Sequence, residues 1–162
     1  MIPDLFDIKT KDGDVVAVDL ETYDPELKTH GSGALRDKGK VVGVALAYRD
    51  KKFYFPIGHV CKKNEKKILS VSNLAANQVW RVLNKKIFQN KNITKVFHNA
   101  MYDVCWIRHE TGLMVQGPIV DTMIAASVID ENRMRYSLDS LAKDYLKDSK
   151  YKHDLADKAL ED

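Results

Sequence analysis

Short apolar runs separated by polar segments predict strands in the first third of the chain. A run of valines and alanine predicts a strand over residues 15–22, and a second apolar run predicts a strand over 41–48. A hairpin partner is expected over 52–56, after a tight turn. The polar, glycine-bearing segment 23–40 predicts a long loop that borders a site. These three strands predict an antiparallel start to the sheet.

Helical spacing dominates the rest of the chain. Apolar residues three and four apart predict a helix over 73–88, with Ser72 or Asn73 as its N-cap. A short apolar run predicts a strand over 95–98, and a helix is expected over 104–110.

Two further helices complete the predicted order. One is expected over 123–129, with Asp121 and Thr122 as its cap, and Ser137 is expected to cap another that begins at Leu138. The predicted order βββαβααα is typical of an α/β domain in which a parallel strand follows a helical crossover.

Two acidic residues interrupt the first predicted strand. Asp19 and Glu21 are two residues apart, so their carboxylates point to the same face of a strand. Such a like-charge pair is unfavourable unless a cation lies between its members, and Mg²⁺ or Mn²⁺ takes oxygen ligands. The alternative is that both carboxylates only face water. The pair therefore marks a candidate metal site.

A second polar group follows the strand predicted over 95–98. Asn99, Tyr102 and Asp103 would lie at the carboxyl edge of this strand, where open α/β sheets bind ligands. Taken alone, Asp103 is better explained by the favourable interaction of an acidic residue with the dipole of a helix N-terminus. Its combination with Asp19 and Glu21 favours one shared site.

Other conspicuous residues have simpler explanations. Three histidines share no spacing and are expected to be structural or exposed: His59, His98 and His109. Trp80 and Trp106 lie in apolar helical patterns and are expected in the core.

Composition limits the class of protein. The 162 residues, of which 44% are hydrophobic, suffice for one domain with a core, and we expect a single domain over 1–162. The net charge of +3 permits nucleic-acid binding without requiring it. No apolar stretch reaches membrane-spanning length and the N-terminus does not resemble a signal peptide. We expect a soluble, intracellular protein with no membrane partner.

Four short motifs occur in order along the chain: Asp19-Leu20-Glu21-Thr22, Asn99-Ala-Met-Tyr-Asp103, Asp121-Thr-Met-Ile-Ala125 and Ser137-Leu-Asp-Ser-Leu-Ala142. Together they resemble the 3′-5′ exonuclease, or proofreading, domain of family A DNA polymerases, phage type, in the DEDD superfamily. The resemblance implies a ribonuclease-H-like mixed sheet, three antiparallel strands and then parallel additions, flanked by helices. It also implies the cytoplasm of a bacterium or of a phage-infected host.

The resemblance further implies an activity and its residues. The activity is hydrolysis of the 3′-terminal phosphodiester of DNA with two divalent cations, Mg²⁺ or Mn²⁺. Asp19 would bridge the cations, Glu21 would ligate the first and Asp103 the second. The residues implied to hold the terminal nucleotide are Leu20, Thr22, Asn99 and Tyr102. The implied partners are the 3′ end of single-stranded DNA and a downstream polymerase domain.

A fourth carboxylate of the family pattern is not found at the expected spacing. It would be an Asp four residues after a Tyr or five after a His, and neither Tyr151 nor His153 has one there. Asp154 and Asp157 stand at other spacings, and one residue on a helix is a rotation of about 100°. We therefore expect the domain to lack its C-terminal helix and to show little exonuclease activity alone.

Two alternative functions remain open. The first is a free-standing DEDD nuclease, which would act on RNA as ribonuclease-D-like proteins do. The second is a noncatalytic remnant of the fold that binds nucleic-acid ends or packs against a partner. Neighbouring genes distinguish a polymerase domain from a free-standing nuclease, and cation titration identifies a remnant.

Overall fold

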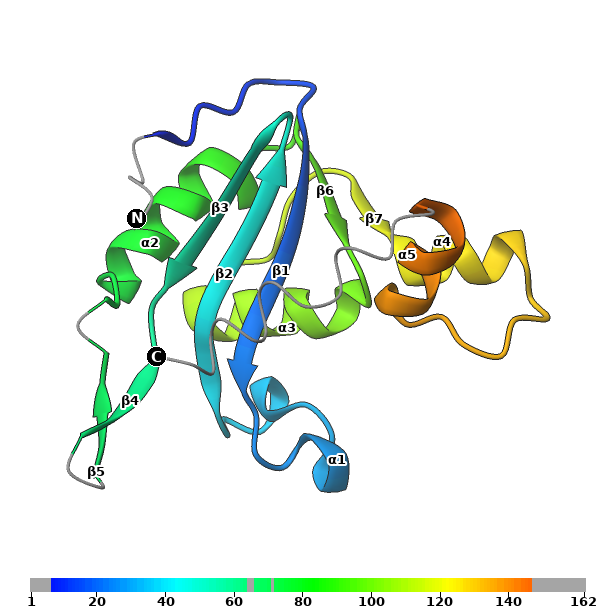
Figure 1. The fold of residues 1–162 in the computed structure, drawn as a ribbon. Helices are drawn as coiled ribbons and strands as arrows, with labels where there is room; N and C mark the ends of the chain where they lie inside the picture. Colours follow the sequence, from blue (N-terminus) through cyan, green and yellow to red (C-terminus); the bar gives the residue numbers. More distant parts are fainter. Residues whose placement is uncertain (1–6, 64–65, 71, 147–162) are drawn as a thin grey trace. The chain divides into compact units, whose positions relative to one another are not determined.

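The computed structural model describes residues 7–63, 66–70 and 72–146 of the chain (Figure 1). It divides into two compact units, one that ends at Asp121 and one that begins at Thr122. Within the described ranges, no helix is long and apolar enough to cross a membrane.

A five-stranded mixed sheet forms the first unit, in the order β3-β2-β1-β6-β7 (Figure 1). The strands β1 (Val15–Tyr23), β2 (Lys40–Tyr48) and β3 (Lys51–Pro56) are antiparallel neighbours. Beyond β1, the strands β6 (Thr94–Phe97) and β7 (Ile119–Asp121) are added in parallel. This confirms the predicted α/β class, with an antiparallel start and parallel additions.

Several short elements were not predicted. The expected loop contains a single helical turn, α1 (Leu27–His30), and a 3-10 turn, η2 (Gly33–Leu35). A separate hairpin is formed by β4 (Val60–Lys63) and β5 (Lys66–Leu69). Elements of three or four residues are too short to show the periodicity of a buried face, which is why the sequence pattern does not reveal them.

The helix predicted over 73–88 begins later than expected. It comprises α2 (Ala76–Leu83) and a π-helical turn, η3 (Asn84–Phe88), and its N-cap is Ala75, which makes no side-chain capping bond. The predicted caps Ser72 and Asn73 are therefore wrong. The Asn73 amide is used elsewhere, because its Oδ1 accepts from the His59 N–H at 2.9 Å and its Nδ2 donates to the His59 carbonyl at 2.8 Å.

The helix that follows β6 begins earlier than predicted. It is α3 (Ala100–Thr111), whereas the pattern predicted a start at residue 104. It ends at Gly112, whose φ of 71° lies in the left-handed region that favours glycine at a helix terminus. The early start places Asp103 within the first helical turn.

One face of the sheet is covered and the other carries the acidic positions. Along β1, Val16, Val18 and Leu20 are buried in the core, whereas Asp19 and Glu21 are exposed. The buried side chains of α2 and α3 belong to the same core cluster, and Figure 1 shows both helices on one side of the sheet. The strand alternation thus directs its carboxylates away from the core.

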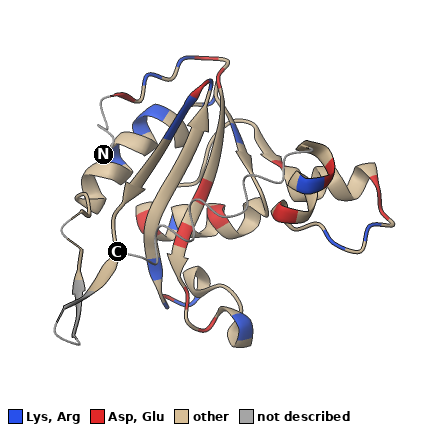
Figure 2. Cartoon of the chain, in the orientation of Figure 1, with Lys and Arg blue, Asp and Glu red and all other residues tan. Residues whose placement is uncertain are grey.

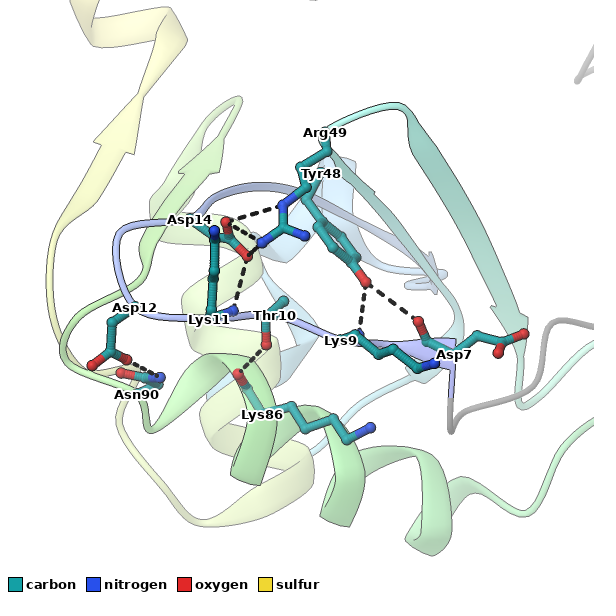
Figure 3. A network of polar contacts seen from close by, with 10 residues as sticks. All are labelled: Asp7, Lys9, Thr10, Lys11, Asp12, Asp14, Tyr48, Arg49, Lys86 and Asn90. Atoms are coloured by element: carbon teal, nitrogen blue, oxygen red, sulfur yellow. Dashed lines mark hydrogen bonds and ion pairs between the residues drawn. The ribbon is translucent and has the colours of Figure 1, made fainter.

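Polar contacts fasten the segment before β1 to the opposite end of the sheet from the acidic positions (Figure 3). The Arg49 guanidinium donates to both carboxylate oxygens of Asp14, at 2.9 Å each. The Tyr48 hydroxyl accepts from the Lys9 N–H at 2.8 Å and donates to the Asp7 carbonyl at 3.4 Å. These contacts fix the segment that leads into β1. They lie at the end of the strand that is remote from Asp19 and Glu21.

The second unit contains α4 (Thr122–Ile129) and α5 (Leu138–Leu146). The predicted cap of α5 is confirmed, because the Ser140 N–H donates to the Ser137 hydroxyl at 3.4 Å. The residues tested for a fourth carboxylate, from Tyr151 to Lys158, lie outside the described residues.

Candidate functional site

The acidic pair of β1 lies where the strand pairing becomes irregular. Asp19 is opposite Ala45 and Glu21 is opposite Gly43, but Thr22 is opposite Val41, so Val42 is an extra residue in β2. Such a bulge twists a strand locally and is common beside functional sites. Asp19 and Glu21 share the exposed face of β1, as predicted.

The third predicted carboxylate reaches β1 from the first turn of α3. Asp103 Oδ1 accepts a hydrogen bond from the Leu20 backbone N–H at 3.1 Å. β6 pairs with β1 only from Val15 to Ala17, so α3 supplies the acceptor where this pairing has ended. Figure 2 shows acidic positions of β1 beside an acidic position of α3.

Burial and like charge act together on Asp103. Its side chain is only 4% exposed, and this burial raises its pKa to about 7. The charges of Asp19 and, to a smaller extent, Asp121 raise the pKa further, while the hydrogen bond from Leu20 opposes the rise. A carboxyl group held in this way is only partly ionised at neutral pH unless a cation joins it.

Asp19 is affected by the charge of His98, a histidine that the sequence analysis expected to be structural or exposed. Loss of surrounding water raises the pKa of Asp19, whereas the charge of His98 lowers it. His98 directly follows β6, at the carboxyl edge of the sheet. The place of His98 directly after a predicted strand was the sequence signal that could have revealed this role. The histidine was set aside because it shares no spacing with the others.

The N-terminus of α3 is organised by Asp121 at the end of β7. Its carboxylate accepts from the N–H groups of Asn99, at 3.1 Å, and Ala100, at 2.7 Å. These bonds cap α3, because β6 and β7 end side by side. The sequence also predicted Asp121 as the cap of the helix that follows it, and this stays a prediction. Asn99 adopts the left-handed conformation, with φ of 66°, and is exposed.

Tyr102 ties the start of α3 to the end of β1. Its hydroxyl lies 2.7 Å from Thr22 Oγ1 and 3.3 Å from Asp24 Oδ2. Its ring meets Trp106 edge to face at 6.4 Å between centroids, and Trp106 is fully buried, as predicted. Two of the predicted nucleotide-binding residues, Thr22 and Tyr102, are thus bonded to each other.

A tyrosine and a histidine from outside the predicted set lie near the acidic pair. Tyr54 on β3 is hydrogen bonded through its hydroxyl to His59 Nε2 at 2.5 Å. Burial, followed by the charges of Glu21 and Asp19, raises the pKa of Tyr54 to about 12. The proximity of this pair to the acids was not predicted, because it depends on how the strands pair.

The predicted site residues are therefore brought together unequally. Asp103 is close to Asp19, and Glu21 shares the exposed face of β1. The side chain of Leu20, predicted to contact a nucleotide, lies in the core. Within the described parts of the chain, no three His, Cys, Asp or Glu side chains form a cluster ready to hold a metal ion.

The chemistry of the donors nevertheless fits a hard divalent cation. All three predicted ligands are carboxylates, which is the donor type that Mg²⁺ and Mn²⁺ prefer. The mutual repulsion of Asp19 and Asp103 is relieved when a cation lies between them.

Comparison with known proteins gives a consistent result. The sequence profile of a 3′-5′ exonuclease family matches residues 6–161. The exosome complex exonuclease RRP6 of Saccharomyces cerevisiae is 35% identical over 124 residues, which are 73% of this chain and 16% of the yeast protein. DNA polymerase I of Pseudomonas aeruginosa is 27% identical over 141 residues, 85% of this chain and 14% of the polymerase. The chain thus spans about a sixth of the length of these relatives.

Solved structures agree with the fold. Brucella melitensis NrnC bound to pGG superposes on this chain with a TM-score of 0.58 and 26% identity. The match covers 84% of this chain and 54% of that one.

Proposed function

Because the chain belongs to the 3′-5′ exonuclease family, we propose that it removes nucleotides from the 3′ end of DNA with the help of two divalent cations, Mg²⁺ or Mn²⁺. The proposed ligands are Asp19, Glu21 and Asp103. The observation that supports this most strongly is the position of Asp103, buried and hydrogen bonded to β1 next to the charge of Asp19. A buried acid of this kind is unfavourable for stability and suits a cation.

The proposed ligands have defined parts in this reaction. When bound, the two cations would activate water and stabilise the leaving 3′-oxygen. Asp19 and Glu21 lie on the exposed face of β1, where their carboxylates would help to hold the cations. Asp103 is held rigid by the Leu20 N–H, so its second oxygen is oriented without further ordering.

The terminal nucleotide is proposed to lie over the start of α3. The exposed amide of Asn99 is available for hydrogen bonds with the terminal sugar, and such contacts do not depend on the base sequence. Thr22 and Tyr102 border the same place, and their mutual hydrogen bond fixes it. Leu20 contributes through its backbone, since its side chain is in the core.

A proofreading role on DNA is supported by the similarity to DNA polymerase I over 85% of this chain. In this setting the partners would be a single-stranded 3′ end and a polymerase domain, in the cytoplasm of a bacterium or a phage-infected host. The charge of +3 is compatible with such a partner.

A free-standing exonuclease that acts on RNA or short oligonucleotides is the second candidate. It is favoured by the higher identity, 35%, to an exosome complex exonuclease and by the likeness to a protein bound to pGG.

The test is degradation of matched DNA and RNA strands, each labelled at its 5′ end, by the purified chain with Mn²⁺. We expect DNA products that shorten stepwise from the 3′ end, slowly, because only three carboxylates are assigned to two cations. Asp19→Ala and EDTA should each abolish the products. Internal cuts, or activity that survives Asp19→Ala, would contradict the proposal, and faster loss of RNA would favour the second candidate.

A further inference from the structure

The hydroxyl of Tyr54 lies beside the position of Glu21 in the sheet. Tyr54, Ala45 and Asp19 are neighbours across three strands, and the next row contains Pro56, Gly43 and Glu21. A Cβ atom at Gly43 would lie only 2.0 Å from the Tyr54 hydroxyl oxygen. Tyr54 is in the same cross-strand row as Asp19, but its phenol extends over Gly43, the residue opposite Glu21. Only glycine at position 43 leaves room for the phenol.

His59 holds the phenol in this position. Its Nε2 is 2.5 Å from the Tyr54 hydroxyl, and the two rings meet at 67° with centroids 5.7 Å apart. The chain turns back towards the site because the N–H groups of Ile57 and Gly58 both donate to the Val42 carbonyl at 2.9 Å. The main chain of His59 is then fixed on both sides by the Asn73 amide.

Fold stability does not account for this arrangement. Tyr54 is 37% exposed, lies on the side of the sheet opposite the core and packs on a glycine. Its hydroxyl can donate one hydrogen bond and accept others, and His59 uses only one of these. A polar group that is held rigidly, remains accessible to solvent and stands beside two carboxylates is suited to binding a ligand of that site.

We propose that Tyr54 and His59 bind the terminal phosphodiester of the strand beside Glu21. With the strand bound, His59 Nε2–H donates to the Tyr54 oxygen, and the Tyr54 O–H donates to a non-bridging phosphate oxygen. This inference rests on the proposed function and adds a substrate contact to it. His59 is a positioning residue, which acts through Tyr54.

The test measures binding of a 5′-labelled single strand by fluorescence anisotropy with Ca²⁺, together with the initial rate with Mn²⁺. Tyr54→Phe keeps the ring over Gly43 and should weaken binding about ten-fold. The matched control is Tyr48→Phe, which removes a hydroxyl from the core side of the sheet, where it contacts Lys9 (Figure 3), and should leave binding unchanged. His59→Leu should resemble Tyr54→Phe, and His59→Gln, which can still donate, should recover part of the affinity.

Two further measurements separate contact from packing. A strand whose last linkage is a methylphosphonate lacks one phosphate oxygen and its charge, so Tyr54→Phe should have little effect on its binding. In ¹⁵N NMR, strand binding should change His59 Nε2 from a hydrogen-bond acceptor to an N–H donor in the wild-type protein and not in Tyr54→Phe.

The outcomes are distinguishable. If the wild type binds and Asp19→Ala prevents degradation, but Tyr54→Phe behaves like Tyr48→Phe, this inference is wrong and the proposed function stands. An equal loss on both kinds of strand would assign Tyr54 a structural role and also overturn the inference. If the wild-type chain neither binds nor degrades the strand, the proposed function fails and the inference fails with it.

Discussion

Asp103 accepts a hydrogen bond from the Leu20 amide at 3.1 Å, which joins the first turn of α3 to the strand that carries Asp19 and Glu21. This contact places a buried carboxyl group next to a second acid. Its consequences are measurable in stability as well as in activity.

The metal-free protein should lose stability as the pH rises. Asp103 ionises near its ordinary value of 3.8 in the unfolded chain, but its pKa in the folded protein is about 7. Between these values the folded state holds a proton that the unfolded state has lost, so the free energy of unfolding falls from about pH 4 to pH 7. The contribution is at most roughly 4 kcal/mol.

Urea denaturation in EDTA at pH 5.0 and pH 7.5 measures this loss. Asp103→Asn keeps an oxygen for the Leu20 N–H and carries no charge, so it should be more stable than the wild type at pH 7.5 and less dependent on pH. An identical pH dependence in the two proteins would show that Asp103 is not the group responsible.

Divalent cations should reverse this loss. Mn²⁺ stabilises the folded state by binding to it, by about 2.7 kcal/mol at a concentration one hundred times the dissociation constant. Because protons compete for Asp103, the rise in melting temperature should be larger at pH 7.5 than at pH 5.5. Asp19→Asn should reduce this rise, whereas Asp37→Asn, an exposed control, should not. Equal stabilisation of all three proteins would place the cation elsewhere.

Removal of the Asp121 carboxylate should weaken the start of α3. Asp121→Ala leaves the N–H groups of Asn99 and Ala100 without this acceptor, and we expect a loss of about 1–2 kcal/mol in urea denaturation. Asp121→Asn should lose less, since its amide oxygen can still accept. Both variants should also lower the pKa of Asp103, which NMR titration of its carboxyl carbon can follow.

Lys95 should be important for stability although it is charged. Its side chain is fully buried, and its ammonium group donates to the carbonyls of Asn90, Ile93 and Gln116 at 2.5, 2.9 and 2.5 Å. Lys95→Met leaves three carbonyls without this donor and should lower the free energy of unfolding by about 3 kcal/mol. Lys51→Met, on an exposed lysine, should change it by less than about 0.5 kcal/mol.

Tyr102→Phe should affect the site more than the fold. The variant retains the ring against Trp106 but loses the hydroxyl contacts with Thr22 and Asp24, so we expect a stability loss of about 1 kcal/mol. Exonuclease rate should fall several-fold, because Thr22 and the end of β1 lose their link to α3. A rate equal to that of the wild type would show that this link is dispensable.

The sequence allowed the sheet and the acids of β1 to be predicted because their signals are local. Buried and exposed residues alternate from Val16 to Leu20, and this period of two places Asp19 and Glu21 together on the exposed face of β1. The apolar run of β2 and the short turn to β3 are local in the same way.

The features of the site that could not be predicted depend on contacts between residues that are distant in the sequence. Asp121 caps α3 only because β6 and β7 end together, and Tyr54 approaches Glu21 only through the register of three strands. Asn73 failed as a cap because its amide binds His59, fourteen residues away. In each case the tertiary structure brings a polar side chain to a partner that is distant in the sequence.

The cap on α3 has a consequence for the order in which ligands assemble. A helix N-terminus usually attracts phosphate, but here the Asp121 carboxylate already occupies those N–H groups. An incoming strand therefore meets carboxylates at this edge, and its charge is repelled until cations are present. Strand and cation binding should be thermodynamically linked, so that each raises the affinity of the other by the same factor. The affinity for the cations and the affinity for the nucleic acid are then both determined by the carboxylates at this edge of the sheet.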